Sequence, residues 1–139
     1  MKIPIDSDEP AGTGGVLAPF FGPKVGIADL VRAHEPGDLR VVELRVTTLG
    51  PDGFETCARF RSADGTVTGE FVNRWRRGED GLLQRLGGSS MRVSGSGRRL
   101  GLQLHVNMVE FARRSGNVGE FQVVARDVGR YAYRFLHGV

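Results

Sequence analysis

Cysteine is nearly absent from this sequence: Cys57 is the single example among 139 residues. One thiol cannot form an intramolecular disulfide, and it leaves no set of cysteines for a structural zinc site. No histidine or arginine arrangement that would activate a thiol can be placed beside Cys57, so we do not expect a catalytic cysteine. We therefore expect a protein of a reducing compartment, without a metal site.

Long hydrophobic runs are also lacking, since no segment approaches the ~18 apolar residues that a membrane-spanning helix needs. The first residues, Met1 to Asp6, turn acidic within a few positions and lack the apolar segment of a secretory signal. We expect a cytoplasmic protein with no membrane partner. A chain of 139 residues fits one domain with a single hydrophobic core.

Lysine is scarce, because 17 of the 19 basic residues are arginine. The segment 74–114 concentrates them against three acidic residues, Glu79, Asp80 and Glu110, which gives a local charge of +6 in a chain of net charge +3. The nine arginines of this segment are Arg74, Arg76, Arg77, Arg85, Arg92, Arg98, Arg99, Arg113 and Arg114. A focused positive field attracts phosphate or carboxylate groups, although a solvated basic surface gives the same composition. Aromatic residues that would stack nucleic-acid bases are not interleaved here except at Trp75, so we do not expect a nucleic-acid partner.

Residues 1–24 hold four of the six prolines and a glycine run, the composition of a flexible N-terminal arm. Within it, Phe20 and Phe21 predict a short piece that docks on the body or on a partner. The domain is predicted to span residues 25–139, beginning with a short helix over Val25–His34.

The middle of the chain alternates polar and apolar residues with a period of two. This pattern predicts strands over Leu39–Thr48, Phe54–Arg61 and Thr66–Arg76, an antiparallel meander in which Asp64-Gly65 forms a type I′ hairpin turn. A short apolar piece, 82–86, and a possible strand at Met91–Val93 follow.

The last third predicts two helices around one strand. Apolar residues of the segment Arg98–Ser115 recur at helical spacing on two sides, and Gly116 is placed to end this helix. Phe121–Ala125 is an apolar run typical of an interior strand. A final helix is predicted to begin at Asp127 and to carry Tyr131, Phe135 and Leu136, aromatic and apolar residues that serve either for packing or in a site. The fold class is therefore α/β (α+β), a mixed, mainly antiparallel twisted sheet flanked by helices.

The loop before the long helix is the strongest candidate for a binding site. Ser94-Gly95-Ser96-Gly97-Arg98-Arg99-Leu100-Gly101 lies between a predicted strand and a predicted helix. Backbone N–H groups that converge at a helix N-terminus bind pyrophosphate, and arginines add charge-assisted hydrogen bonds. The dinucleotide fingerprint and the Walker A pattern are both absent. A plain connecting loop remains the alternative.

The order of these segments resembles the GNAT N-acetyltransferase superfamily. The resemblance rests on the loop, the helix ending in "EFARRSG", the strand "EFQVVA" and the segment "DVGRYAYRFLHGV". It covers residues 41–139 and is closest to GNAT-like domains of actinobacterial toxin-associated proteins. It implies a cytoplasmic transferase that binds acetyl-CoA, or another acyl-CoA, in a splayed gap between two central strands. The acyl acceptor would be an amine of a small molecule or peptide.

Carried over position by position, the resemblance implies a pyrophosphate site and a proton donor. The matching positions for the cofactor are Val93, Gly97, Arg98, Arg99, Leu100, Gly101 and Leu102. Tyr133, or failing it Tyr131, matches the tyrosine that protonates the leaving thiolate.

The sequence departs from the family at three places. Ser96 stands where the family has Gln or Arg, Arg99 stands where it has glycine, and the chain ends at Val139 without the final strand. A homodimer or a partner chain could complete the sheet. These departures also fit a GNAT-shaped accessory protein that binds without catalysing, in a biosynthetic or toxin-related complex.

Two further residues have alternative roles. Glu70 is either a general base acting on the amine or an exposed strand carboxylate near Arg59 or Arg61. His105, inside the long helix, is either a base or a structural histidine.

Overall fold

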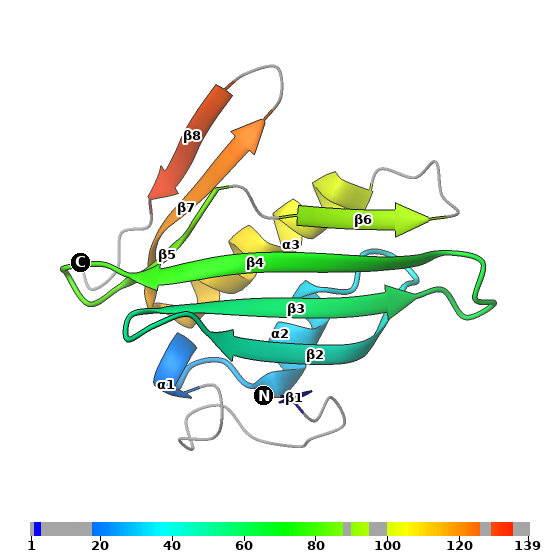
Figure 1. Ribbon diagram of the computed structural model, residues 1–139, viewed down its shortest axis with the longest axis horizontal. Coiled ribbons are helices and arrows are strands. Elements are labelled where there is room, and N and C mark those ends of the chain that lie inside the picture. Colours follow the sequence, from blue (N-terminus) through cyan, green and yellow to red (C-terminus); the bar gives the residue numbers. More distant parts are fainter. Residues whose placement is uncertain (1, 4–17, 88–89, 95–99, 126–128, 135–139) are drawn as a thin grey trace.

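In the computed structural model, the described residues are 2–3, 18–87, 90–94, 100–125 and 129–134. They form a mixed α+β fold with one mainly antiparallel sheet and helices packed on it (Figure 1). The helices are α1 (Ala18–Phe21), α2 (Ile27–Ala33) and α3 (Leu100–Ser115). The strands are β1 (Lys2–Ile3), β2 (Arg40–Thr48), β3 (Gly53–Arg61), β4 (Thr68–Arg77), β5 (Leu83–Arg85), β6 (Ser90–Ser94), β7 (Val118–Ala125) and β8 (Gly129–Arg134).

The predicted meander is confirmed, with β2, β3 and β4 paired antiparallel in sequence order. Alternate residues of these strands are buried on one face, among them Phe54, Phe60, Phe71 and Trp75, and they join α2 and α3 in one core. Figure 1 shows both helices behind the strands on that face. Within the described residues no helix covers the opposite face, which we call the open face.

The expected docking of the N-terminal aromatic pair is confirmed. Phe21 is fully buried, and its ring makes edge contacts with Trp75, Phe54 and Phe111 at centroid distances of 5.1, 5.5 and 5.0 Å. Aromatic pairs favour this geometry. The N-terminal segment therefore contributes to the core between the sheet and α3.

The turn between β3 and β4 differs from the prediction. Gly65 has a positive φ of 75°, but no non-glycine residue in the described part of the chain has one, so Asp64-Gly65 is not a type I′ turn. The loop closes instead through Ser62 N donating to Val67 O at 2.9 Å. The Asp64 carboxylate accepts hydrogen bonds from Ser62 and Thr66 inside the loop. These side-chain bonds, absent from a two-residue turn, account for the wider loop.

The predicted last helix is wrong, because residues 129–134 form strand β8, paired antiparallel with β7. The helical prediction rested on the spacing of Tyr131, Phe135 and Leu136, of which the last two lie outside the described residues. Tyr131 and Tyr133 also alternate with a period of two, and aromatic residues favour strands. The edge of β7 provides backbone partners that the isolated sequence does not show.

This strand also corrects the expectation that the sheet ends without its final strand. β8 lies beside β7 and continues the order β1-β2-β3-β4-β5-β7-β8. The homodimer or partner chain that we invoked to complete the sheet remains a prediction. The long helix is described from Leu100 onward, and Arg98 lies outside the described residues. Gly116 ends the helix with a φ of 70°, as predicted. No helix in the described ranges is long and apolar enough to span a membrane.

Candidate functional site: an arginine-lined hollow and a strand fork

Two rows of polar side chains cross the open face on three adjacent strands. Strand register places Arg59 opposite Glu70 and Glu70 opposite Arg92, so these side chains share one face of β3, β4 and β6. One step further along, Arg61, Thr68 and Ser94 form a second row in the same way. Directly opposed side chains in a sheet lie about 5 Å apart, and consecutive rows on one face lie about 7 Å apart. The Cβ atoms of these six residues therefore form an array of two adjacent rows, from which the Arg61 and Arg92 side chains extend in different directions.

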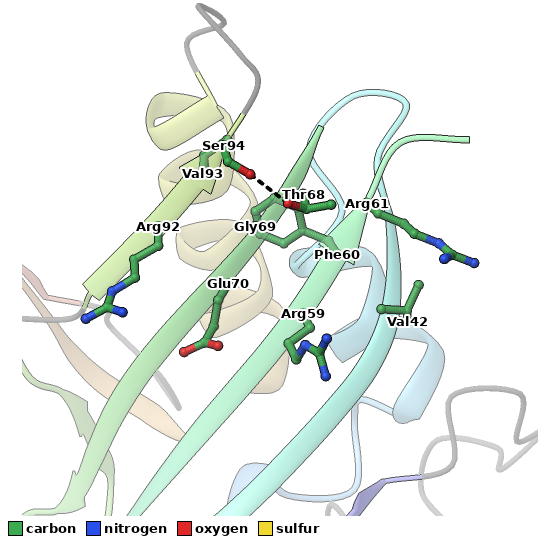
Figure 2. Close-up of a pocket in the computed structure, with 10 residues that line it drawn as sticks. All are labelled: Val42, Arg59, Phe60, Arg61, Thr68, Gly69, Glu70, Arg92, Val93 and Ser94. Atoms are coloured by element: carbon green, nitrogen blue, oxygen red, sulfur yellow. Dashed lines mark hydrogen bonds between the residues drawn. The ribbon is translucent and has the colours of Figure 1, made fainter. Parts of the chain in front are cut away.

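This array lines an open hollow of about 450 Å³, called the arginine hollow below. Val42 stands at its rim, and Phe60, Gly69 and Val93 lie in the row beneath. Figure 2 shows Glu70 between Arg59 and Arg92, and the hydrogen bond of 2.7 Å between the hydroxyls of Thr68 and Ser94. A Cβ on Gly69 would lie 2.4 Å from the Phe60 ring, so only glycine permits the ring to pack there.

The charges of the arginine hollow are only partly paired. Arg59 donates to Glu43 on β2 at 3.1 Å. The guanidinium groups of Arg61 and Arg92 have no hydrogen bond or ion pair within the described part of the chain. Glu70 also forms no ion pair within the described part of the chain, although its carboxylate interacts with the Cys57 thiol. Three guanidiniums against one carboxylate make the hollow positive, and unpaired guanidiniums are available to an anion.

The Cys57 thiol lies on the same face and is not activated. Partial burial, followed by the negative charges of Glu70, Glu55 and Glu43, raises its pKa above the ordinary value. The thiol is therefore protonated at neutral pH, which agrees with the expectation that Cys57 is not a nucleophile.

A second feature lies where β5 and β6 follow one another along β4. Arg85 is opposite Trp75 and Ser90 is opposite Val72, so the chain has four residues, 86–89, where β4 has two, Asn73 and Arg74. β5 and β6 are therefore two separate strands along β4.

Strand β7 continues beside β5 but not beside β6. It pairs in parallel with Leu83, Gln84 and Arg85, and β6 has no strand partner other than β4 in the described ranges. Figure 1 shows β6 and β7 diverging, with α3 behind them. We call this divergence the strand fork. The chain leaves β6 at Ser94 and enters α3 at Leu100, and the first turn of α3 carries no acidic residue.

A buried polar chain lies at the root of the strand fork. Arg85, 7% exposed, donates through Nε to Asn73 Oδ1 at 3.0 Å and through a terminal nitrogen to the Gln122 carbonyl oxygen at 2.8 Å. Its guanidinium carbon lies 4.6 Å from the centroid of the Phe121 ring. Burial lowers its pKa to about 10, still well above neutral pH, and among the described residues no carboxylate pairs with it. This arginine is therefore a buried charge held by neutral groups.

The chain continues from Asn73 to His34 on the far side of the core. Asn73 Nδ2 lies 3.5 Å from His34 Nε2, and His34 Nδ1 lies 2.8 Å from the Leu30 carbonyl oxygen. Because a carbonyl only accepts, Nδ1 carries the proton and Nε2 accepts from the amide. Burial lowers the pKa of His34 to about 4, which keeps the ring neutral.

The structure brings together only some of the predicted site residues. Glu70 and Val93 both line the arginine hollow. Leu100, Gly101 and Leu102 form the first turn of α3. Gly97, Arg98 and Arg99 lie outside the described residues.

Tyr133 is placed apart from Glu70. It lies on β8 opposite Phe121, and β8 is three strand spacings, roughly 14 Å, from β4 before any offset along the strands is added. The strands that carry Tyr133 and Glu70 are therefore separated by β5 and β7.

His105 takes a packing role in the structure. Its ring makes an edge contact with Phe121 at 5.5 Å, and burial, with Arg85 nearby, lowers its pKa. In the described ranges no three of the side chains that commonly bind metals gather into a site.

The described arginines of the predicted basic segment do not form one patch. Arg85 is buried, Arg74 pairs with Glu55 on the open face, and Arg114 pairs with Asp29 of α2. The hollow instead combines Arg92 with Arg59 and Arg61 of another strand. The sequence pattern did not predict that Arg85 is buried. Its position two residues after Leu83 in a short strand, which places both side chains on one face, was the available signal.

Comparison with known proteins gives no match: no family model, no curated protein and no solved structure matches this chain. The geometry of the arginine hollow and the strand fork therefore carries the functional inference.

Proposed function

We propose that this protein is an acyl-CoA-dependent N-acyltransferase with a GNAT-like fold. The observation that carries the proposal is the strand fork, in which β7 pairs in parallel with β5 but not with β6. This is the splayed arrangement that the resemblance of the sequence implies for acyl-CoA. The order of strand, loop and long helix after the fork supports the same assignment.

The described residues fit such a ligand. Strand β6 offers backbone groups along its unpaired edge, and an extended pantetheine chain carries amides that can pair with them. Met91 on β6 is 39% exposed, so an apolar contact is available beside these backbone groups. The N–H groups of the first turn of α3 are unsatisfied by the helix itself and favour the pyrophosphate.

Acyl-CoA would supply the acyl group as an activated thioester. In the transfer, an N–C bond forms to the acceptor amine and the C–S bond breaks. The nitrogen loses one proton, and the sulfur gains one. Glu70 is the residue that we propose as the base for the amine, directly or through water. Tyr133 is the residue that the family resemblance proposes as proton donor to the sulfur.

Cofactor binding is tested by thermal unfolding with and without CoA. Binding at 100 times the dissociation constant stabilises the folded state by about 2.7 kcal/mol and raises the melting temperature by several degrees. Arg98→Glu with Arg99→Glu should abolish the shift. The matched control is Arg76→Glu with Arg77→Glu, a neighbouring pair of exposed arginines at the opposite end of β4 from the partner of Ser94. No shift at millimolar CoA would sink the proposal.

Turnover is tested by thiol release from acetyl-CoA with a panel of small amines and peptides. Glu70→Gln should lower kcat/KM by about 100-fold or more if Glu70 is the base. Tyr133→Phe should lower kcat only if Tyr133 reaches the sulfur. An unchanged rate in Glu70→Gln rejects the assigned base.

The separation of Glu70 from Tyr133 favours a second candidate, an accessory protein that binds acyl-CoA without transferring the acyl group. In that case CoA raises the melting temperature, no amine in the panel is acetylated, and Tyr133→Phe changes nothing. Detectable turnover that is lost in Glu70→Gln would eliminate this candidate.

A further inference from the structure

We propose that the arginine hollow binds a small molecule that carries both an ammonium group and an anionic group, and that this molecule is the acyl acceptor. The second clause rests on the proposed function, but the binding itself does not.

The anionic group fits the row of Arg61, Thr68 and Ser94. The guanidiniums of Arg61 in this row and of Arg92 in the adjacent row have no partner within the described part of the chain. The two hydroxyls donate as readily to an oxyanion as to each other. Guanidinium groups bind carboxylates and phosphates through charge-assisted hydrogen bonds. This side of the hollow is therefore a receptor for an oxyanion.

The ammonium group fits the adjacent row, at Glu70. This carboxylate is exposed, and no arginine pairs with it among the described residues although register places one on either side. An anion alone would be repelled by Glu70, and an amine alone would be repelled by the guanidiniums. Rows about 7 Å apart suit a molecule in which both charges are separated by a few bonds.

The hollow is also stiff enough to hold this array. Three of its strands are joined by continuous antiparallel pairing, and the Phe60 ring packs against Gly69 on the core side of the sheet. Arg59 is fixed by Glu43. The positions of Thr68 and Glu70 are therefore set by the sheet and not by a loop.

The test is an NMR titration of the ¹⁵N-labelled full chain, without CoA. The probes are O-phosphoethanolamine, which has both charges, ethanolamine, which has only the amine, and inorganic phosphate. β-Alanine replaces phosphate by carboxylate and shows which oxyanion is preferred. We expect O-phosphoethanolamine to bind at least 10-fold more tightly than the single-charge probes, with shifts at residues 68–70 and 92–94.

The variants separate the two charges. Arg92→Gln and Arg61→Gln should each weaken O-phosphoethanolamine binding about 5- to 10-fold, whereas Arg76→Gln, on the same face outside the hollow, should not. Glu70→Gln should weaken O-phosphoethanolamine and strengthen inorganic phosphate. The amide spectrum of each variant checks that it is folded.

Equal affinity for O-phosphoethanolamine and inorganic phosphate would overturn the inference. So would the absence of chemical-shift changes at a probe concentration about 20 times a dissociation constant of ~1 mM. If O-phosphoethanolamine binds and CoA does not, the arginine hollow stands as a binding site and the acyltransferase proposal is rejected. If CoA binds and O-phosphoethanolamine does not, the acyltransferase proposal stands and the binding inference for the hollow is rejected.

Discussion

Asn73 of β4 accepts a hydrogen bond of 3.0 Å from the buried guanidinium of Arg85 on β5, at the place where β7 begins to diverge from β6. The same amide donates toward His34, so its two ends are used in opposite senses. Asn73 therefore connects the end of α2, the meander and the strand fork through one hydrogen bond that it accepts and one that it donates.

Asn73→Ala should destabilise the protein by about 2–4 kcal/mol. The substitution removes the acceptor of a buried guanidinium and the donor to a buried imidazole, and each unsatisfied group costs about 1–3 kcal/mol. Urea unfolding measures the change. The matched control is Arg76→Ala on the same strand, which is exposed and should change stability by less than about 0.5 kcal/mol.

Arg85→Met should cost less than Asn73→Ala, because it also removes a charge that is buried without a carboxylate. The double variant should be less destabilised than the sum of the two single variants by about 1 kcal/mol or more, since both remove one interaction. Strict additivity would show that the two side chains do not depend on each other.

Folding stability should fall as the pH is lowered from about 6.5 to about 4. In this window the unfolded chain binds a proton at His34 and the folded chain does not, so protons favour unfolding. The difference between the ordinary value and about 4 corresponds to about 3 kcal/mol. Urea unfolding across this range measures it, and NMR titration of the His34 ring should show no protonation above pH 5.

His105 contributes in the same direction, because its pKa is also lowered. His34→Gln should therefore flatten most, but not all, of the slope between pH 6.5 and 4. His105→Gln is the matched control and should flatten it less. A slope that His34→Gln leaves unchanged would contradict the buried, neutral state of His34.

The meander could be predicted from the sequence because its alternation of polar and apolar residues is local. Register could not, since Glu70 faces Arg59 and Arg92 only through pairing between distant segments. The strand fork could not be predicted for the same reason, because it also depends on pairing between distant segments. The pattern of residues 129–134 fits both a helical and a strand period. Pairing with the edge of β7 selects the strand, and the sequence of this segment alone does not reveal that edge.

Gly69→Ala should destabilise the protein by about 1–3 kcal/mol, because the added Cβ would lie 2.4 Å from the Phe60 ring and 2.9 Å from the Arg92 carbonyl oxygen. Phe60→Leu in the same chain should recover part of this loss by clearing the ring. Gly81→Ala is no control, since its positive φ adds strain; Gly78→Ala serves better. Equal stability of Gly69→Ala and wild type would show that the ring can move aside.

Phe21→Ala should destabilise the protein by about 3–5 kcal/mol, the usual cost of removing a buried aromatic ring. The ring is fully buried among Phe54, Trp75 and Phe111, so its loss leaves a cavity between the sheet and α3. Phe20→Ala is the matched control, because Phe20 is only partly buried and, among the described residues, its ring contacts Phe54 alone. A smaller loss for Phe21→Ala than for Phe20→Ala, measured by thermal unfolding, would contradict the docking of α1. If the docking is correct, removing residues 1–24 should lower the melting temperature at least as much as Phe21→Ala, because the truncation removes the same ring.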